Sequence, residues 1–151
     1  MHRSAWGRTL IAILLGGALA AAIPVLPAVG QDSPPHPVVD IGTGRLVAKG
    51  AAVDLAVTYT CGPGDLVFGY LYVELTQRTQ QGRLAQGYGF TDDIVCDGTP
   101  HTVIVRVTPD VYFGGSAFKS GTALATATLV VRLEGFTTEV ETVSEEIRLR
   151  A

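Results

Sequence analysis

Beyond residue 38, apolar and polar residues alternate with a period of two along almost the whole chain. Val53, Leu55 and Val57 share one side of such a segment, while Asp54 and Thr58 share the other. No segment repeats its apolar residues with the 3.6-residue period of an amphipathic helix. Alternation of this kind predicts half-buried strands in antiparallel sheets.

Turn signals divide the alternating region into short pieces. Gly62-Pro63-Gly64 ends one strand, and the dipeptides Gln81-Gly82, Asp97-Gly98 and Glu134-Gly135 are typical of hairpin turns. The predicted strands cover residues 44–49, 51–61, 68–78, 83–95, 100–108, 121–133 and 137–149. Seven short strands at this spacing predict an all-β domain, an antiparallel two-sheet sandwich of immunoglobulin-like or fibronectin type.

The two cysteines, Cys61 and Cys96, form an isolated pair. In the predicted topology the second strand pairs antiparallel with the fifth, so the end of one lies beside the entry to the other. Cys61 and Cys96 then meet at one rim, and we predict a disulfide between neighbouring strands. Antibody domains instead bridge their two sheets over a buried Trp, and the one Trp here, Trp6, lies outside the predicted domain.

The first thirty residues have the order of a secretory leader. Arg3 and Arg8 precede a run without charge from Thr9 to Val29, which small residues close before Gln31. We predict a signal peptide with a helical apolar region at 1–30, a Pro-rich linker at 31–38 and one domain at 39–151. The run is nearly long enough to span a bilayer, so an uncleaved N-terminal anchor is the alternative.

Charge excludes some partners. The chain has eleven basic and fourteen acidic residues. Arg3 and Arg8 belong to the leader, so nine basic residues face fourteen acidic ones in the mature part, a net charge of −5. Such a domain lacks the basic footprint that nucleic acid or anionic lipid requires. We therefore expect no nucleic-acid partner, and contact with a membrane only through an uncleaved leader.

Several short motifs are shared with a known kind of protein. The segments Tyr59-Thr-Cys61, Val73-x-x-Thr-Gln77 and Cys96-Asp-Gly-Thr-Pro-His101, with the strand that contains Ala125, resemble small secreted proteins of actinobacteria. Those proteins have a signal peptide, one immunoglobulin-like domain and no assigned activity. The resemblance implies fold and location, and it brings no catalytic residues with it.

The sequence gives little support for a catalytic site. Ser116-Ala-Phe-Lys119 matches the Ser-x-x-Lys run of penicillin-binding enzymes, but those enzymes need a helix there and a Ser-Asp-Asn triplet, and this chain has no Asn. His101 is the single histidine within the predicted domain, and a rim histidine that caps a turn is the ordinary outcome. We expect no enzyme activity and no cofactor.

The acidic residues do not have the spacing of a known metal loop. Asp92, Asp93 and Asp97 cluster near Cys96 without the Asp-x-Asp-x-Asp-Gly pattern of a calcium-binding hand. We expect these charges to keep a rim soluble, and we predict no metal site. The glutamates of the last strand are interpreted in the same way.

Two features favour binding. Tyr70 and Tyr72 alternate with Leu71 and Val73, so they are predicted to form an outward aromatic stripe, which Tyr88 or Phe90 would extend. The alternative is that these rings only stabilise neighbouring strands. The second feature is the long, Gly-containing loop 110–119, whose aromatic residues are Tyr112, Phe113 and Phe118. Phe113 and Phe118 would, in the alternative, plug the open end of the domain.

The sequence thus predicts a secreted, non-catalytic β-module with a binding or structural role at the cell surface or outside it. Its partner is expected to be a protein or a cell-envelope ligand. A membrane-tethered accessory domain with an uncleaved leader is the first alternative. A small secreted hydrolase is the second.

Overall fold

The structure is a computed structural model, and it describes residues 36–79, 82–110 and 115–151. The predicted leader and most of the predicted linker lie outside the described residues. Seven strands follow one another in these described ranges: β1 (Val38–Val47), β2 (Ala52–Thr60), β3 (Leu66–Arg78), β4 (Leu84–Thr91), β5 (His101–Pro109), β6 (Gly121–Leu133) and β7 (Glu139–Arg150). A short 3-10 turn, η1 (Ala48–Gly50), separates β1 from β2. The described part of the chain has no helix long and apolar enough to cross a membrane.

The all-β class and the seven strands agree with the sequence prediction, with shifted boundaries at six of them. β1 begins at Val38, six residues before the predicted start at 44. β4 ends at Thr91, four residues before the predicted end at 95, because the chain turns through Asp92–Ile94 toward the disulfide. β7 runs from Glu139 to Arg150 and therefore starts two residues later than expected.

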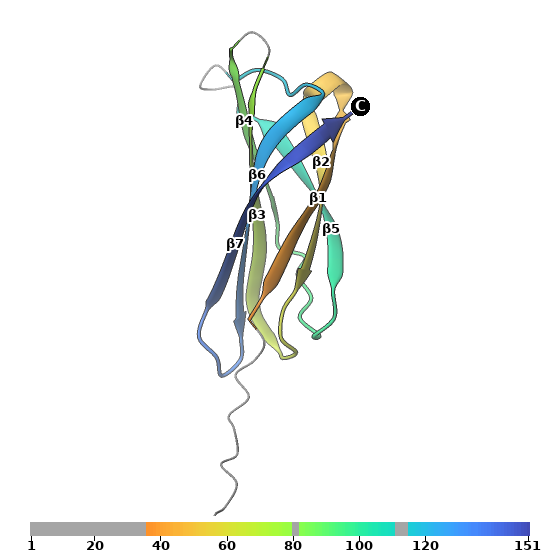
Figure 1. Cartoon of the computed structure of the whole chain (residues 1–151). Coiled ribbons are helices and arrows are strands. Elements are labelled where there is room, and N and C mark those ends of the chain that lie inside the picture. Colours follow the sequence, from red (N-terminus) through yellow and green to blue (C-terminus); the bar gives the residue numbers. More distant parts are fainter. Residues whose placement is uncertain (1–35, 80–81, 111–114) are drawn as a thin grey trace, which may run out of the picture. The chain divides into compact units, whose positions relative to one another are not determined.

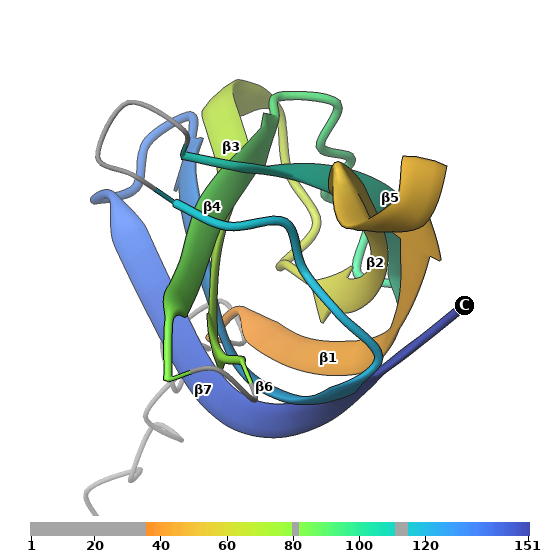
Figure 2. The ribbon, with the colours of Figure 1, turned by 90° about the horizontal axis from the view of Figure 1, so that it is seen from above.

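The predicted two-sheet sandwich is wrong, because the strands form one closed barrel in the order β1-β2-β5-β4-β3-β6-β7. Figure 1 shows the strands running along the long direction of the barrel. Figure 2 looks along the strands and shows them arranged in a ring. The expected antiparallel pairing of the second and fifth strands is confirmed, with Tyr59 opposite His101 at one end of β2. The structure shares with immunoglobulin-like proteins only its all-β class.

Two short seams turn what would be separate sheets into a barrel. At the first, β4 pairs with β5 only through Gly87 opposite Pro109 and Tyr88 opposite Thr108. At the second, β1 runs parallel to β7, with Gly44 opposite Leu149 as one of two pairs. The remaining five neighbouring pairs of strands are antiparallel and longer.

Glycines permit both seams. Ala85, Gly87 and Gly89 are the inward residues of β4, and an added Cβ at Gly87 or Gly89 would collide with carbonyl oxygens of β5. A Cβ at Gly44 would stand 2.5 Å from a methyl group of Leu149. Because glycine has no side chain, the strand backbones can approach closely at these positions. Closure removes the four open edges, those of β1, β5, β4 and β7, that two separate sheets would leave.

The core fills the barrel with aliphatic side chains from every strand. Leu55, Leu71, Leu75 and Leu129 are fully buried there. Burying one such side chain contributes about 1.5–3 kcal/mol. The alternating pattern of the sequence therefore predicted correctly which residues face inward.

The two ends of the barrel are closed differently. At one end Cys61 and Cys96 form the predicted disulfide, with Cα atoms 5.0 Å apart. Beside it, the amide of Val95 donates a hydrogen bond to the Tyr59 hydroxyl at 3.0 Å. At the other end the fully buried ring of Phe118 enters the core, and its amide donates to the Gly50 carbonyl at 3.0 Å.

Candidate binding surface

The two predicted tyrosines of β3 point away from the core. Leu71 and Val73 are fully buried, so the alternation of the strand turns Tyr70 and Tyr72 to the outer face. Tyr72 is 36% exposed, and Tyr70 is partly covered. Burial, and secondly the nearby carboxylate of Glu74, raises the pKa of Tyr72 above its ordinary value of 10.0. The Tyr72 hydroxyl, like that of an ordinary tyrosine, is protonated at neutral pH and can donate a hydrogen bond.

β4 supplies two more rings to this face. Tyr72 and Tyr88 stack with their centroids 6.2 Å apart, and Tyr70 meets Phe90 at 5.7 Å in a tilted arrangement. Tyr88 and Phe90 are 53% and 60% exposed, because the inward positions of β4 are taken by Ala85, Gly87 and Gly89. We call these four rings, Tyr70, Tyr72, Tyr88 and Phe90, the aromatic face.

A groove of about 690 Å³ lies beside the aromatic face. Its described lining combines rings, an aliphatic side chain and planar polar groups: Tyr72, Glu74, Arg83, Leu84, Gln86, Tyr88, Asp110 and Gly115. Gln86 Nε2 donates a hydrogen bond to Glu74 Oε1 at 2.6 Å, across the β3–β4 pair. This bond orients both side chains and leaves the second carboxylate oxygen and the amide oxygen as acceptors.

The 110–119 loop gives a divided result. Tyr112 and Phe113 lie outside the described residues. Phe118 is fully buried, which agrees with the alternative in which it plugs the end of the domain. Its ring is therefore not available at the surface of this structure.

His101 belongs to a local turn. Its Nε2 lies 2.9 Å from Asp97 Oδ1, and its ring stacks on Tyr59 with centroids 5.9 Å apart. The amide and the hydroxyl of Thr99 donate to the same Asp97 oxygen at 2.8 and 2.7 Å. These hydrogen bonds, first that of the Thr99 hydroxyl and then that of His101, hold the pKa of Asp97 well below its usual range. The arrangement is that of a capped turn.

The acidic residues near the disulfide do not gather into a metal centre. Within the described ranges, no three His, Cys, Asp or Glu side chains are placed to share a metal ion. Asp93 is held by a local turn in which its amide donates to the Thr91 hydroxyl at 3.3 Å. Asp97 is occupied by Thr99 and His101.

The outer side of β2 carries a charged cluster that the sequence did not reveal. Asp54 is only 8% exposed although it faces outward, because Arg45 and Arg106 from the two neighbouring strands cover it. Arg106 Nε donates to Asp54 Oδ1 at 2.7 Å, and Arg45 donates to Oδ2 at 3.3 Å. The hydrogen bond from Arg106 is the main reason that the pKa of Asp54 is lowered. With its oxygens occupied, this carboxylate is structural.

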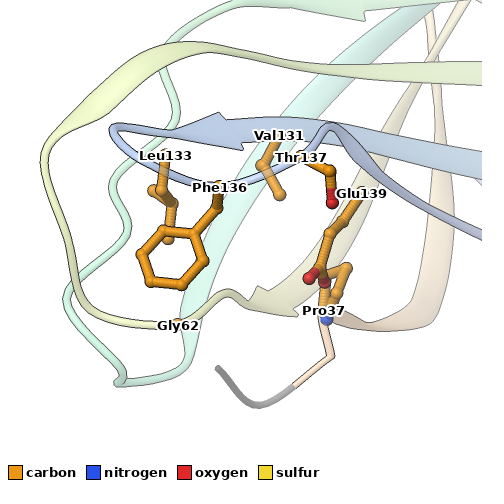
Figure 3. A pocket seen from close by; sticks show the side chains of 7 residues that line it. All are labelled: Pro37, Gly62, Val131, Leu133, Phe136, Thr137 and Glu139. Atoms are coloured by element: carbon orange, nitrogen blue, oxygen red, sulfur yellow. The ribbon is translucent and has the colours of Figure 1, made fainter. Parts of the chain in front are cut away.

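A small cavity at the β6–β7 turn is shown in Figure 3. Phe136, Leu133 and Pro37 line it together with Gly62, Val131, Thr137 and Glu139. Its volume is about 10 Å³, which is room for about one water molecule. It is too small to hold a ligand, so the aromatic face and its groove are the stronger candidate.

No known protein family matches this chain, and no curated protein matches it. The candidate site therefore depends on its own chemistry. Sequence reasoning found Tyr70 and Tyr72 from alternation, but it did not find Glu74, Gln86 or Arg83. These three come together only through the β3–β4 register, in which Thr76 lies opposite Gln86. The turn signal at Gly82, with an alternating segment on each side, indicates a hairpin. Pairing the two segments across that turn could have brought these residues together.

Proposed function

We propose that this chain is an exported, non-catalytic binding module that recognises a carbohydrate of the cell envelope through the aromatic face and the adjoining groove. The observation that carries the proposal is the stacked pair Tyr72 and Tyr88 on the border of a groove that holds the Glu74–Gln86 pair. The groove offers ring surface and directed polar groups within one site.

Sugar rings have the matching chemistry. Their C–H faces are apolar and pack on aromatic rings, while their hydroxyl groups both donate and accept hydrogen bonds in the plane of the ring. Tyr72 and Tyr88 provide the aromatic surface, Glu74 provides acceptors, and Arg83 provides donors. Rigid rings with few rotatable bonds also lose little entropy when a ligand binds.

Two observations support an extracellular setting. The 1–30 segment has the order of a secretory leader, and the Cys61–Cys96 bridge is compatible with an oxidising compartment. An uncleaved leader would instead tether the same module to the outer side of the membrane. The proposed binding chemistry is the same in both cases.

The test uses exported protein on a glycan array and on purified cell-envelope polysaccharides. We expect saturable binding to a subset of these glycans. The double variant Tyr72→Ala/Tyr88→Ala should bind them at least about tenfold more weakly, since each lost ring contact is worth on the order of 1 kcal/mol. Ile104→Ala is the matched control, because Ile104 on β5 is 63% exposed and lies outside the aromatic face.

Far-UV circular dichroism and thermal melting of all variants separate loss of binding from loss of fold. The proposal fails if the parent binds no glycan on either platform. It also fails if the folded double variant binds as tightly as the parent does. Binding of a protein instead of a glycan through Tyr72 and Tyr88 would contradict the ligand class.

A further inference from the structure

A second groove, of about 720 Å³, lies where β3 ends, β4 begins and the chain enters β6. Arg83 lines both this groove and the one beside the aromatic face. The described lining of the second groove contains three cations, Arg78, Arg83 and Lys119, four residues with hydroxyl groups, and no acidic residue.

Within the described ranges, the three cations form no ion pair with a carboxylate. Among the ion pairs between described residues, Arg78, Arg83 and Lys119 take no part. The mature chain is acidic, with nine basic residues against fourteen acidic ones. A groove that concentrates three basic residues in such a protein is a local positive site, and a concave site of one sign attracts ligands of the opposite sign.

The backbone beneath the cations is anchored. Gln77, only 4% exposed, donates from Nε2 to the Lys119 carbonyl at 2.8 Å and accepts at Oε1 from the Lys119 amide at 2.8 Å. Its Nε2 also donates to the Thr122 carbonyl at 3.3 Å. Phe118, the residue before Lys119, is buried in the core and anchors the chain at this point.

The hairpin side of the groove is held as well. The amide and the hydroxyl of Thr79 donate to the Arg83 carbonyl at 2.9 and 3.1 Å. Lys119 and Arg83 are therefore exposed residues on restrained main chain. Such positions suit ligand binding, since less conformational freedom is lost when the ligand arrives.

We propose that this basic groove binds a phosphate group. A phosphate carries a charge of about −1.5 to −2 and three strong acceptor oxygens, which match two guanidinium groups and one ammonium group better than the single charge of a carboxylate does. The hydroxyl groups of Ser120 and Thr122 add donors at the same site. The two sites share Arg83, whereas Lys119 lines only the basic groove, so Lys119→Gln tests phosphate binding separately from carbohydrate binding.

This assignment gives the Ser116-x-x-Lys119 run a role. The hydroxyl of Ser116 donates to the Leu84 carbonyl at 3.4 Å, and Ser116 and Lys119 both line the basic groove. The pair is thus part of an anion-binding wall. No covalent chemistry is needed to explain why the two residues lie together.

The test is an amide NMR titration of the disulfide-bonded protein with inorganic phosphate at constant ionic strength. We expect saturable shifts of the Lys119, Ser120 and Gly121 amides. Arg83→Gln and Lys119→Gln should each weaken binding about fivefold, the effect of losing one exposed charge contact. Arg132→Gln on β6 is the matched control, because it removes one positive charge outside the groove and should leave the affinity unchanged.

A parallel titration with glucose 1-phosphate distinguishes two sources of the same group. Tighter binding than inorganic phosphate would identify a phosphate ester of a larger molecule as the ligand, and equal binding would identify the free anion. The proposal is overturned if neither compound shifts these amides. It is also overturned if Arg132→Gln weakens binding as much as Lys119→Gln does. The hydrogen bonds between the Gln77 side chain and the Lys119 backbone keep this segment in place in the variants, so loss of fold is not expected. The spectra themselves report whether the fold is kept.

Discussion

Gly87 on β4 lies directly against the carbonyl oxygen of Thr108 on β5, with no room for a side chain between the two strands. The contact belongs to the seam at which the barrel closes, where Tyr88 pairs with Thr108. The same alternation that leaves β4 bare on its inner side places Tyr88 and Phe90 on its outer side. Closure of the barrel and display of the aromatic face are therefore two consequences of one short sequence.

We predict that Gly87→Ala lowers the free energy of unfolding by about 1–3 kcal/mol, because the added methyl group forces β4 away from β5. Urea denaturation followed by circular dichroism measures the change. Gly64→Ala is the control, since the nearest atom to its added Cβ is a terminal methyl group of Leu133 at 3.3 Å, which can move aside. Equal stability of Gly87→Ala and the parent would show that the seam is not tightly packed.

Replacing both Cys61 and Cys96 by Ala should lower the stability by roughly 2–5 kcal/mol. The bridge spans 35 residues, so its removal releases a long loop in the unfolded chain. Thermal melting of the double variant and thiol labelling of the native protein provide the measurements. Free thiols in the native exported protein, or a melting temperature unchanged by reduction, would contradict this prediction.

The Asp54 cluster should make stability depend on pH. The pKa of Asp54 is lowered from its ordinary value of 3.8, chiefly by the hydrogen bond from Arg106, so the folded state binds the proton less readily than the unfolded state. The stabilisation is therefore present above about pH 4 and is lost as the pH falls through the lowered folded-state pKa.

Asp54→Asn should accordingly cost about 1 kcal/mol at pH 7, a modest value because both arginines are largely exposed. The difference from the parent should shrink as the pH falls below about 4, as measured by urea denaturation at a series of acidic pH values. Asp40→Asn is the control, because Asp40 lies exposed on β1 and forms no ion pair among the described residues. A difference for Asp54→Asn that is constant with pH would mean that charge pairing is not its cause.

The leader should be removed near Gly30. N-terminal sequencing of protein collected from the medium is expected to begin close to Gln31, after the small residues that end the apolar run. A full-length product found in the membrane fraction would support the tethered alternative instead.

The candidate site was predicted in part. Alternation placed Tyr70 and Tyr72 outward without any knowledge of the fold, since neighbouring residues of a strand face opposite sides. The groove residues Glu74, Gln86 and Arg83 were missed, because their proximity depends on the register between β3 and β4. Phe118 belongs to the core, and the loop pattern alone did not separate that outcome from surface exposure.

The sequence by itself determined the strands, their inner faces and the disulfide pair, because these follow from period-two patterning, turn residues and a single possible pairing of two cysteines. Only the tertiary structure decided that the strands close into a barrel. Closure depends on which strands become neighbours and on how near their backbones come at Gly44, Gly87 and Gly89. A glycine permits close approach of another backbone wherever it occurs, so its structural role depends on which strand lies opposite. The same dependence on neighbours explains why the Asp54 cluster and the basic groove emerged only in three dimensions.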